Sequence, residues 1–461
     1  MFLNPELRRN IWLEFSIHRI IITPVTIGLI LYLVYLTSNA TKSAEIAFDI
    51  ACFFIFLWGT KNASETVINE VNGSTWDFQR QSAISPWSMT WGKLLGGTLF
   101  SWYGAAICLI VYYVLHAHDA MHGILFQIPN ELTPEQEILL LVAGGLFGQA
   151  IALLSSLQVL PQIRREKTNK TFRYFIVGAI SGIFITSYSF QAVKAAGVQV
   201  KWYGFHFAMG NFALTTLVIF LGWAIVGLQR SFCKELQYRN IPWMWLLFNI
   251  FCMVYFSGLV SIDKLDIQAS LSEIKDIQLL IQQAPLYIAF FIADMLTYLA
   301  LLSDDLNVVR YKKLITRFQE RNYREMLQQF PWWPISYVLA IVVGINTYFN
   351  QKIYSQLFEN FSPAVFIITN ILFMFRDILL IHYFFFDKNP KRNVGTIVVY
   401  LLILYVLVPM ILQALHLYDW TALFIPSWGK NTTIAVISAL VQIVLLAGMC
   451  RQRWQKAWAT A

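Results

Sequence analysis

The sequence predicts an all-α, polytopic integral membrane protein. The chain has 461 residues, of which 57% are hydrophobic and only 13% are charged, whereas soluble domains carry about 25% charged residues. Twelve apolar segments are long enough to cross a hydrocarbon core, which needs about 20 residues per helix. Lysine and arginine residues alternate in number between the loops of the two sides, which supports this number of spans.

The twelve predicted spans follow one another along the whole chain. Two of them are less regular than the others, because the second begins with Glu45 and Asp49 and the fifth ends in the polar sequence SYSFQAVK. The spans are centred near Leu29, Phe53, Ile107, Leu146, Ile183, Leu217, Phe248, Phe290, Ile341, Leu372, Ile403 and Val441. An even number of spans places both termini on the same side of the membrane.

The distribution of positive charge predicts the orientation of the chain. The formal net charge is +8, and 26 of the 34 lysine and arginine residues lie in the segments on the side of the termini, against 7 on the other side. By the positive-inside rule, both termini are cytoplasmic, as expected for a multi-pass protein of the bacterial inner membrane. The same distribution argues against a nucleic-acid partner, because no basic patch is interleaved with aromatic residues.

The N-terminal sequence NPELRRNIWLEFSIHRI predicts an amphipathic helix that lies in the bilayer interface before the first span. Pro5 stands where a helix can begin, and Leu7, Ile11 and Phe15 lie at helical spacing on one face. The opposite, polar face consists of Glu6, Arg9 and Asn10. A cleaved signal peptide is not expected, because no small-residue cleavage site follows a charged start and an apolar region.

The segment 70–93, between the second and third predicted spans, carries helix start and stop signals. Asn72-Gly73 is a turn signal. Ser74–Asp77 has the S-x-x-D pattern of a capping box, which predicts a helix from Ser74 to about Ile84. Ser85-Pro86 predicts a second helix, with the serine as N-cap and the proline at the first position, that continues into the third span.

Aromatic and charged side chains concentrate in this segment, and two interpretations are open. One is an interfacial belt, since tryptophan is common at membrane boundaries. The other is a docking helix for a cytoplasmic protein, since tryptophan and arginine dominate interface hot spots. The residues expected at such a docking surface are Glu70, Thr75, Trp76, Asp77, Arg80, Ser85, Pro86, Trp87 and Lys93.

The first 230 residues resemble bacterial type-2 ABC exporter permeases, the ABC-2 class. The shared features are an amphipathic N-terminal helix, two spans, and then in order Glu70, Thr75, Arg80, Ser85-Pro86 and Gly92-Lys93 before the third span. The resemblance implies that segment 70–93 is a coupling helix, seated in a groove of a separate ABC ATPase subunit. It also implies that this chain binds no cofactor directly, and that ATP and Mg²⁺ are bound by the partner ATPase.

The sequence contains no phosphate-binding loop of its own. GKNTT at Gly429 lacks the glycine that a phosphate cradle needs five residues earlier, where Phe424 stands. A function driven by ATP would therefore depend on a second chain. No catalytic residue is expected in a subunit of this kind.

The number of spans suggests an internal duplication, with residues 1–230 and 231–461 as two six-span halves. Arg9-Asn10-Ile11 before the first span is matched by Arg239-Asn240-Ile241 before the seventh. The loop after the eighth span is acidic at its start, contains an amphipathic helix and ends at Pro331-Trp332-Trp333, in the place that 70–93 has in the first half. The alternative is a homodimer of two first halves, with the other spans as lateral additions.

Three ionisable residues, Asp294, Arg376 and Asp377, lie within predicted spans, where charge is costly unless it is paired. Adjacent residues point to different sides of a helix, so Arg376 and Asp377 are not expected to pair with each other. One interpretation places both near the cytoplasmic end, reaching toward Asp387 and Lys388. The other is a polar lining or an interhelical lock, with Arg376 as a partner of Asp294.

Histidine and cysteine residues do not predict a metal site. His116, His118 and His122 cluster in an extracytoplasmic loop, and the last two have the spacing of ligands on one helix face, but their neighbours are polar and solvated. The five cysteines are dispersed and lack a C-x-x-C motif. They are expected to be small core residues.

Three functions are compatible with the sequence. The first is the membrane-spanning permease subunit of an ATP-driven ABC exporter, which works by alternating access and is not itself an enzyme. The second is an integral-membrane enzyme that modifies lipids or glycans, with His382 and Asp387 as candidate residues. The third is a secondary transporter, which is disfavoured because few ionisable residues lie at mid-membrane.

Overall fold

The structure is a computed structural model, and it divides the chain into two compact units. It describes residues 4–82, 84–122, 133–158, 160, 171–194, 198–259, 271–304, 306, 308–350, 363–386, 393–426 and 432–460. The first unit contains Met1–Val200 and Phe207–Asn240, and the second contains Lys201–His206 and Ile241–Ala461. The boundary expected at residue 230 falls inside a helix, because α11 (Met209–Glu235) continues past it.

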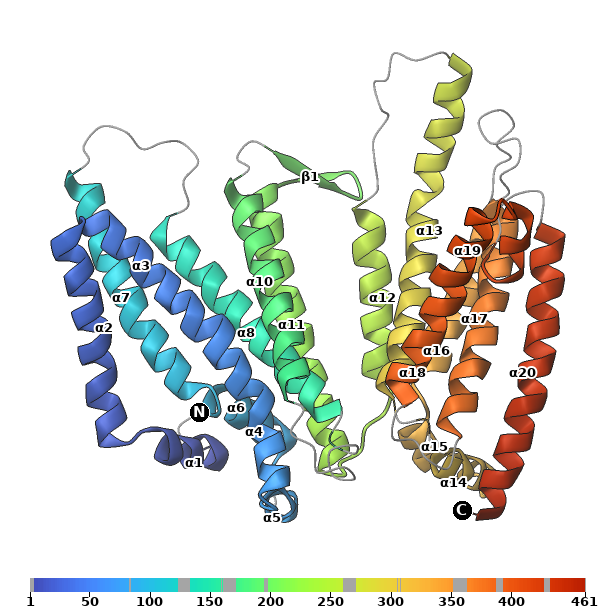
Figure 1. The fold of residues 1–461 in the computed structure, drawn as a ribbon, viewed down its shortest axis with the longest axis horizontal. Coiled ribbons are helices and arrows are strands. Elements are labelled where there is room, and N and C mark those ends of the chain that lie inside the picture. The colour runs from blue at the N-terminus through green and yellow to red at the C-terminus, as the bar shows by residue number, and fades with distance from the viewer. Residues whose placement is uncertain are drawn as a thin grey trace. The chain divides into compact units, whose positions relative to one another are not determined.

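Long apolar helices make up most of the described chain (Figure 1). Ten of the described helices are long and apolar enough to cross a membrane, and the bent pair Tyr323–Gln329 and Trp333–Phe349 would bring the number to eleven. Trp243–Gly258 is apolar but has only 16 residues, or about 24 Å at 1.5 Å per residue. A multi-pass membrane protein is thus confirmed with about ten spans, whereas twelve spans stay a prediction.

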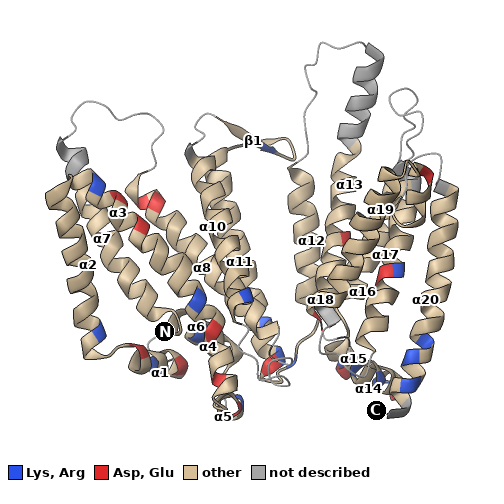
Figure 2. Cartoon of the chain, viewed as in Figure 1, with Lys and Arg blue, Asp and Glu red and all other residues tan. Residues whose placement is uncertain are grey.

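Charge and apolar surface are distributed as a lipid environment requires. Charged residues lie mostly at the ends of the helices, with few along their lengths (Figure 2). Large apolar side chains are exposed on the helix surfaces, among them Leu29, Val444 and Met410. Such a surface is stable against hydrocarbon but not against water.

The first unit is a bundle of long helices with three short helices at one end (Figure 1). The short helices are α1 (Pro5–Glu14), α5 (Trp76–Gln81) and α6 (Pro86–Gly96). The long helices are α2 (Ile17–Thr37), α3 (Ala40–Cys52) with the π-helix η1 (Phe53–Gly59) and α4 (Thr60–Asn72), α7 (Leu99–His122), α8 (Pro134–Gln158), α10 (Phe172–Lys194) and α11.

A buried glutamine holds the π-helix η1 in place within the second span. Nε2 of Gln149 on α8 donates a hydrogen bond of 3.1 Å to the carbonyl of Ile55 in η1, and its Oε1 accepts one of 2.9 Å from Trp102 on α7. A π-helix disturbs the regular backbone ladder and is frequent at functional sites. The fully buried amide of Gln149 thus joins α8, α7 and η1.

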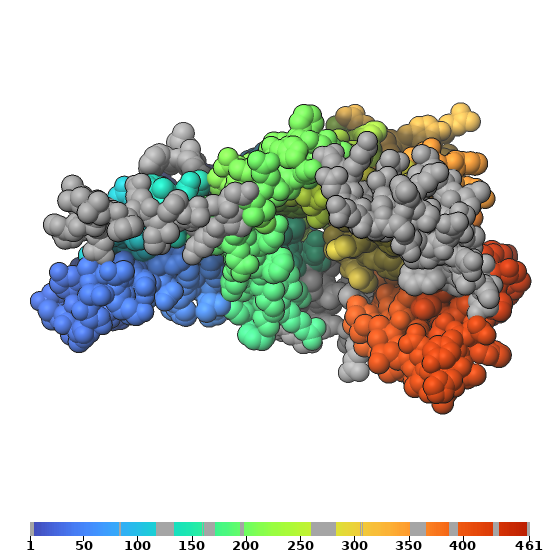
Figure 3. Space-filling view, turned by 90° about the horizontal axis from the view of Figure 1, so that it is seen from above, coloured from blue at the N-terminus to red at the C-terminus, as the bar shows by residue number. Residues whose placement is uncertain are grey.

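The second unit repeats the plan of long helices with short helices at one end (Figure 1). The short helices at that end are α14 (Val308–Gln319) and α15 (Tyr323–Gln329). The longer ones are α12 (Trp243–Gly258), α13 (Leu271–Ser303), α16 (Trp333–Phe349), α17 (Pro363–Phe385) and α20 (Thr432–Thr460). Between α17 and α20 come α18 (Asn393–Leu402), the π-helix η3 (Ile403–Leu407), α19 (Val408–Ala414) and the 3₁₀-helix η4 (Tyr418–Leu423), which form one lobe of this unit's surface in Figure 3.

The helices of the two units pair in a partly similar order. In the first unit α3 packs on α7 and α8 packs on α11; in the second unit α13 packs on α16 and α17 packs on α20. These are the second with the third span and the fourth with the sixth, in the twelve-span numbering. The units differ in the fifth span, because α10 packs extensively on α8 whereas α18 makes few contacts with α17. The duplication therefore stays a prediction.

A two-stranded hairpin, β1 (Gln199–Trp202) and β2 (Phe205–Ala208), interrupts the all-α architecture that the sequence predicts. Tyr203 and Gly204 at its tip have positive φ angles of 48° and 81°, as a tight hairpin turn requires. Trp202 Nε1 donates to the carbonyl of Tyr255 at 3.0 Å, so the tip packs on the end of α12. The hairpin lacks the Asn-Gly or Asp-Gly signal by which such turns are usually predicted.

Small residues bring α8 and α10 into close contact. A Cβ atom on Gly148 would lie 2.9 Å from the carbonyl oxygen of Gly178, and one on Gly182 would lie 3.0 Å from the Cα of Gly148. Gly178 and Gly182 form a G-x-x-x-G motif, which allows backbones in a membrane to approach closely. The motif is visible in the sequence, but this interface is not among the features predicted from it.

Replacement of Gly178 by alanine is expected to destabilise the first unit. The new Cβ would lie 2.5 Å from the Cβ of Ala152, and overpacking of this kind costs about 1–3 kcal/mol. The control is Gly222→Ala on α11, where nothing lies within 4 Å of the new Cβ. Thermal unfolding of both variants in detergent checks this, and equal melting temperatures would contradict the close packing.

Candidate functional site

Segment 70–93 begins where α4 ends, and its first turn differs from the predicted capping box. Ser74 has a φ of 59° and is not an N-cap. The amide of Thr75 donates to the carbonyl of Glu70 at 2.9 Å, which closes the end of α4. The helix α5 starts only at Trp76, has no side-chain cap, and ends at Gln81 rather than at Ile84. The S-x-x-D signal was wrong because the left-handed turn that terminates α4 occupies the same residues.

The second helix of the segment starts as predicted. The Oγ atom of Ser85 accepts a hydrogen bond of 3.2 Å from the amide of Ser88, and Pro86 is the first residue of α6. The helix does not continue directly into the third span, because a turn at 97–98 separates α6 from α7. The segment therefore forms two short helices at the end of the bundle.

A buried lysine joins three elements of the first unit. Lys93 of α6 is fully buried, and its Nζ forms ion pairs with Glu6 of α1, at 2.7 Å, and with Glu70 of α4. Arg9 of α1 pairs with both carboxylates as well. Burial holds the pKa of Lys93 below its usual value, and the carboxylates of Glu70 and Glu6 offset only part of this lowering. We call Glu6, Arg9, Glu70 and Lys93 the ion cluster.

The helix α1 faces the bundle with its polar side. Glu6 and Asn10 are buried, whereas Trp12 and Leu13 are 81% and 67% exposed. The Nδ2 atom of Asn10 donates to the carbonyl of Gly92 at 3.1 Å. A Cβ atom on Gly92 would lie 2.6 Å from the Cβ of Glu6, so glycine is what allows α1 to lie this close to α6.

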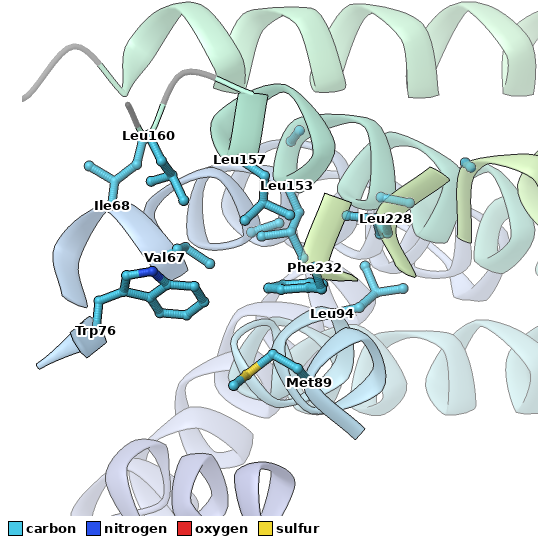
Figure 4. Close-up of a cluster of buried hydrophobic side chains, with 14 residues drawn as sticks. Val67, Ile68, Trp76, Met89, Leu94, Leu153, Leu157, Leu160, Leu228 and Phe232 are labelled. Carbon is cyan, nitrogen blue, oxygen red and sulfur yellow. The ribbon is translucent and has the colours of Figure 1, made fainter. Parts of the chain in front are cut away.

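Two predicted docking residues hold α5 on the bundle instead of projecting from it. Trp76 is 1% exposed and points into a cluster of buried apolar side chains from α4, α6, α8 and α11 (Figure 4). Its ring lies 6.4 Å from that of Phe232. Nε of Arg80 donates to the carbonyl of Glu235, at the end of α11, at 3.0 Å.

The exposed face of the segment consists of other side chains. Phe78, which is not among the residues predicted for the docking surface, is 76% exposed, and Trp87 is 47% exposed. Asp77, Thr75 and Ser85 are exposed too, whereas Pro86, like Lys93 and Trp76, is buried. The exposed surface of the segment therefore includes Thr75, Asp77, Phe78, Ser85 and Trp87, whereas Trp76, Pro86 and Lys93 of the predicted set are buried.

The corresponding place in the second unit has its own ion pair and a buried histidine. Arg310 of α14 pairs with Asp304 at 2.6 Å, after the end of α13. His382 of α17 is buried, and its Nε2 lies 2.7 Å from the hydroxyl of Tyr311. Aromatic rings from Trp333 and Phe386 also contact it. His382 is thus a packed core residue, and Asp387, its expected partner in an enzyme site, lies outside the described residues.

Arg376 and Asp377 form a buried ion pair within α17, contrary to the expectation that adjacent residues would not meet. Nε and Nη2 of Arg376 lie 2.8 Å and 2.7 Å from Oδ1 of Asp377. The two residues start on different sides of the helix, but the arginine side chain is long enough for its guanidinium to reach the carboxylate of its neighbour. Both residues are 1% exposed or less. Asp387 and Lys388, toward which one interpretation has them reach, lie outside the described residues.

Hydrogen bonds from other helices complete this pair. Oδ2 of Asp377 accepts from the hydroxyls of Tyr298 on α13, at 2.7 Å, and Tyr405 in η3, at 2.6 Å. Nη1 of Arg376 donates to Gln442 on α20 at 3.1 Å. These bonds connect the pair to α13, η3 and α20. Asp294 is not the partner of Arg376 within the described residues.

No metal cluster of histidine, cysteine or acidic residues occurs among the described side chains. The side chains of His118 and His122 lie outside them, so the histidine cluster is not tested. The cysteines are all free, and four of the five are buried.

Comparisons of the chain with protein-family models, with curated proteins and with solved structures found no match in any of the three.

Replacement of Lys93 by methionine is expected to destabilise the first unit by about 3 kcal/mol, because it leaves buried carboxylates without their central cation. The matched control is Lys42→Met, since Lys42 forms an exposed pair with Glu45, and exposed pairs contribute about 0–1 kcal/mol. Thermal unfolding in detergent measures both. The triple variant with Glu6→Gln and Glu70→Gln should recover part of the loss; no recovery, or a loss equal to the control, would contradict the ion cluster.

Proposed function

We propose that the chain is the membrane-spanning permease subunit of an ATP-driven ABC exporter, and that a separate ABC ATPase docks on α5 and the start of α6. One observation carries the proposal. The helix α5 is fixed to the bundle by Trp76 and Arg80, yet Asp77 and Phe78 on it are exposed, as is Trp87 at the start of α6. A large exposed aromatic side chain on a rigid support is typical of an interface hot spot.

The proposed mechanism is alternating access, driven by movement of the docked segment. A force on α5 passes to α11 through Arg80 and to the apolar cluster through Trp76. A force on α6 passes to α1 and α4 through the ion cluster. Because these contacts are buried and packed, the segment and the ends of three helices move as one body. The bundle then alternates between two packings that expose the transport path to opposite sides.

The proposal includes the cell compartment and the assembly. With the docking segment in the cytoplasm, both termini are cytoplasmic and the membrane is the bacterial inner membrane. Two transmembrane halves are needed for such an exporter. The similar pairing of helices in the two units favours two halves in one chain, and a homodimer of chains is the alternative.

A secondary transporter is the second candidate, because the structure places ionisable groups inside the spans. Arg376 and Asp377 are buried in α17, and the π-helix η3 contributes Tyr405 to them. Buried ionisable residues beside an irregular helix are typical of ion-coupled transporters. The two candidates differ in their energy source, so a bound ATPase distinguishes them. A membrane enzyme has no comparable support, since His382 is a packed core residue.

The test of the proposed function is recovery of a P-loop ATPase with the tagged full-length chain from its own host membranes. The double variant Phe78→Asp and Trp87→Asp is expected to weaken binding of the ATPase roughly 700-fold, since each hot spot contributes about 2 kcal/mol and the two together about 4 kcal/mol. Phe205→Asp is the matched control, because Phe205 is 65% exposed and lies on the hairpin. Recovery that is absent with the wild type, or unchanged in the double variant, would refute ATPase docking at this surface.

A further inference from the structure

Asp294, Arg376 and Asp377 are the ionisable residues predicted within the spans. Arg376 and Asp377 stabilise each other's charge, whereas no contact among the described residues stabilises a charge on Asp294. Asp294 lies on α13, within the span Gln283–Ser303. Its Oδ1 atom is buried and has no hydrogen-bond partner among the described residues. No lysine, arginine or histidine of the described chain is within ion-pairing distance of it. An ionised carboxylate in such a place is costly.

Arg376, the basic residue predicted as a partner of Asp294, is already neutralised by Asp377. Both of its paired nitrogens face Oδ1 of Asp377, and its Nη1 donates to the carbonyl of Phe424 and to Gln442. Arg376 and Asp377 together carry no net charge. An ionised Asp294 would therefore leave the site with one negative charge in the membrane interior.

The hydroxyl donors around Asp294 are also engaged elsewhere. Asp294 is close enough to Tyr298, Tyr337 and Asp377 to interact with them electrostatically. Tyr298 donates its proton to Asp377, and Tyr337 on α16 donates to the carbonyl of Ile371 at 3.3 Å. The facing groups thus comprise one carboxylate that repels a negative charge and two hydroxyls that do not stabilise one. The remaining titratable neighbour in the site, Tyr405, also donates to Asp377.

We propose that Asp294 is a proton-binding site inside the membrane and holds a proton at neutral pH. Because Arg376 is paired with Asp377, its charge does not neutralise Asp294. The hydroxyls of Tyr298 and Tyr405 hold the Arg376–Asp377 pair in place. Binding and release of this proton add or remove one charge at the junction of α13, α16 and α17, next to the π-helix η3. The inference does not depend on the energy source of transport, so it stands whether or not an ATPase docks.

The first experiment uses dicyclohexylcarbodiimide, which is apolar and modifies protonated carboxyl groups within membranes. The full-length chain in vesicles is treated at neutral pH, and mass spectrometry locates the modified residue. Modification is expected at Asp294 and not at Asp377, and it should disappear in Asp294→Asn. Glu320→Gln is the control, because Glu320 is exposed and paired with Arg317 at 2.9 Å; this variant should be modified at Asp294 like the wild type. Modification at Asp377 instead of Asp294 would overturn the proposal.

An infrared measurement decides the case in which the reagent does not reach the site. The difference spectrum between the wild type and Asp294→Asn at neutral pH should contain the C=O stretching band of a protonated carboxyl group, and the band should shift in D₂O. A thermal unfolding curve like that of the wild type shows that the variant is folded. A difference spectrum that contains only ionised-carboxylate bands would overturn the proposal, whatever the result of the labelling.

Discussion

The ion pairs of Lys93 are the interaction on which the structure of the first unit depends at the end where its short helices lie. A fully buried lysine is unstable without anions, so Glu6 and Glu70 must both lie beside it. That requirement fixes the positions of α1, of the end of α4 and of α6 relative to one another. It also explains why α1 turns its polar side inward. The apolar residues of α1 then face outward, where a bilayer interface can receive them.

Much of the fold could be predicted from composition and helix punctuation, but the side that a helix presents could not. Apolar length located the spans, and Ser85-Pro86 located the start of α6. The capping box at Ser74 was misleading, because a residue that ends one helix with a positive φ cannot also start the next. The residues predicted for docking were identified by type alone. Trp76 and Phe78 are equally aromatic, and only the packing of α5 determines which one is buried.

The two units solve the cost of buried charge in different ways. In the first unit a cation lies between anions near the end of the bundle, so charges from three elements cooperate. In the second unit Arg376 and Asp377 are neighbours in sequence and neutralise each other before other helices add hydrogen bonds. The first arrangement links elements through charge. In the second arrangement the two charges cancel within the span. The charge state of an additional group such as Asp294 then determines the net charge there.

The π-helix η1 has a consequence for the phase of the second span. A π-helix accommodates an extra residue, and one residue corresponds to about 100° of rotation in an α-helix. In a continuous α-helix, the face of α4 with Glu70 and Val67 would line up with one face of α3. The π-helix between them rotates the face of α4 away from that position. Gln149 secures the site of this offset. One extra residue in the middle of the span thus determines which face of α4 points toward α1, α5 and α6.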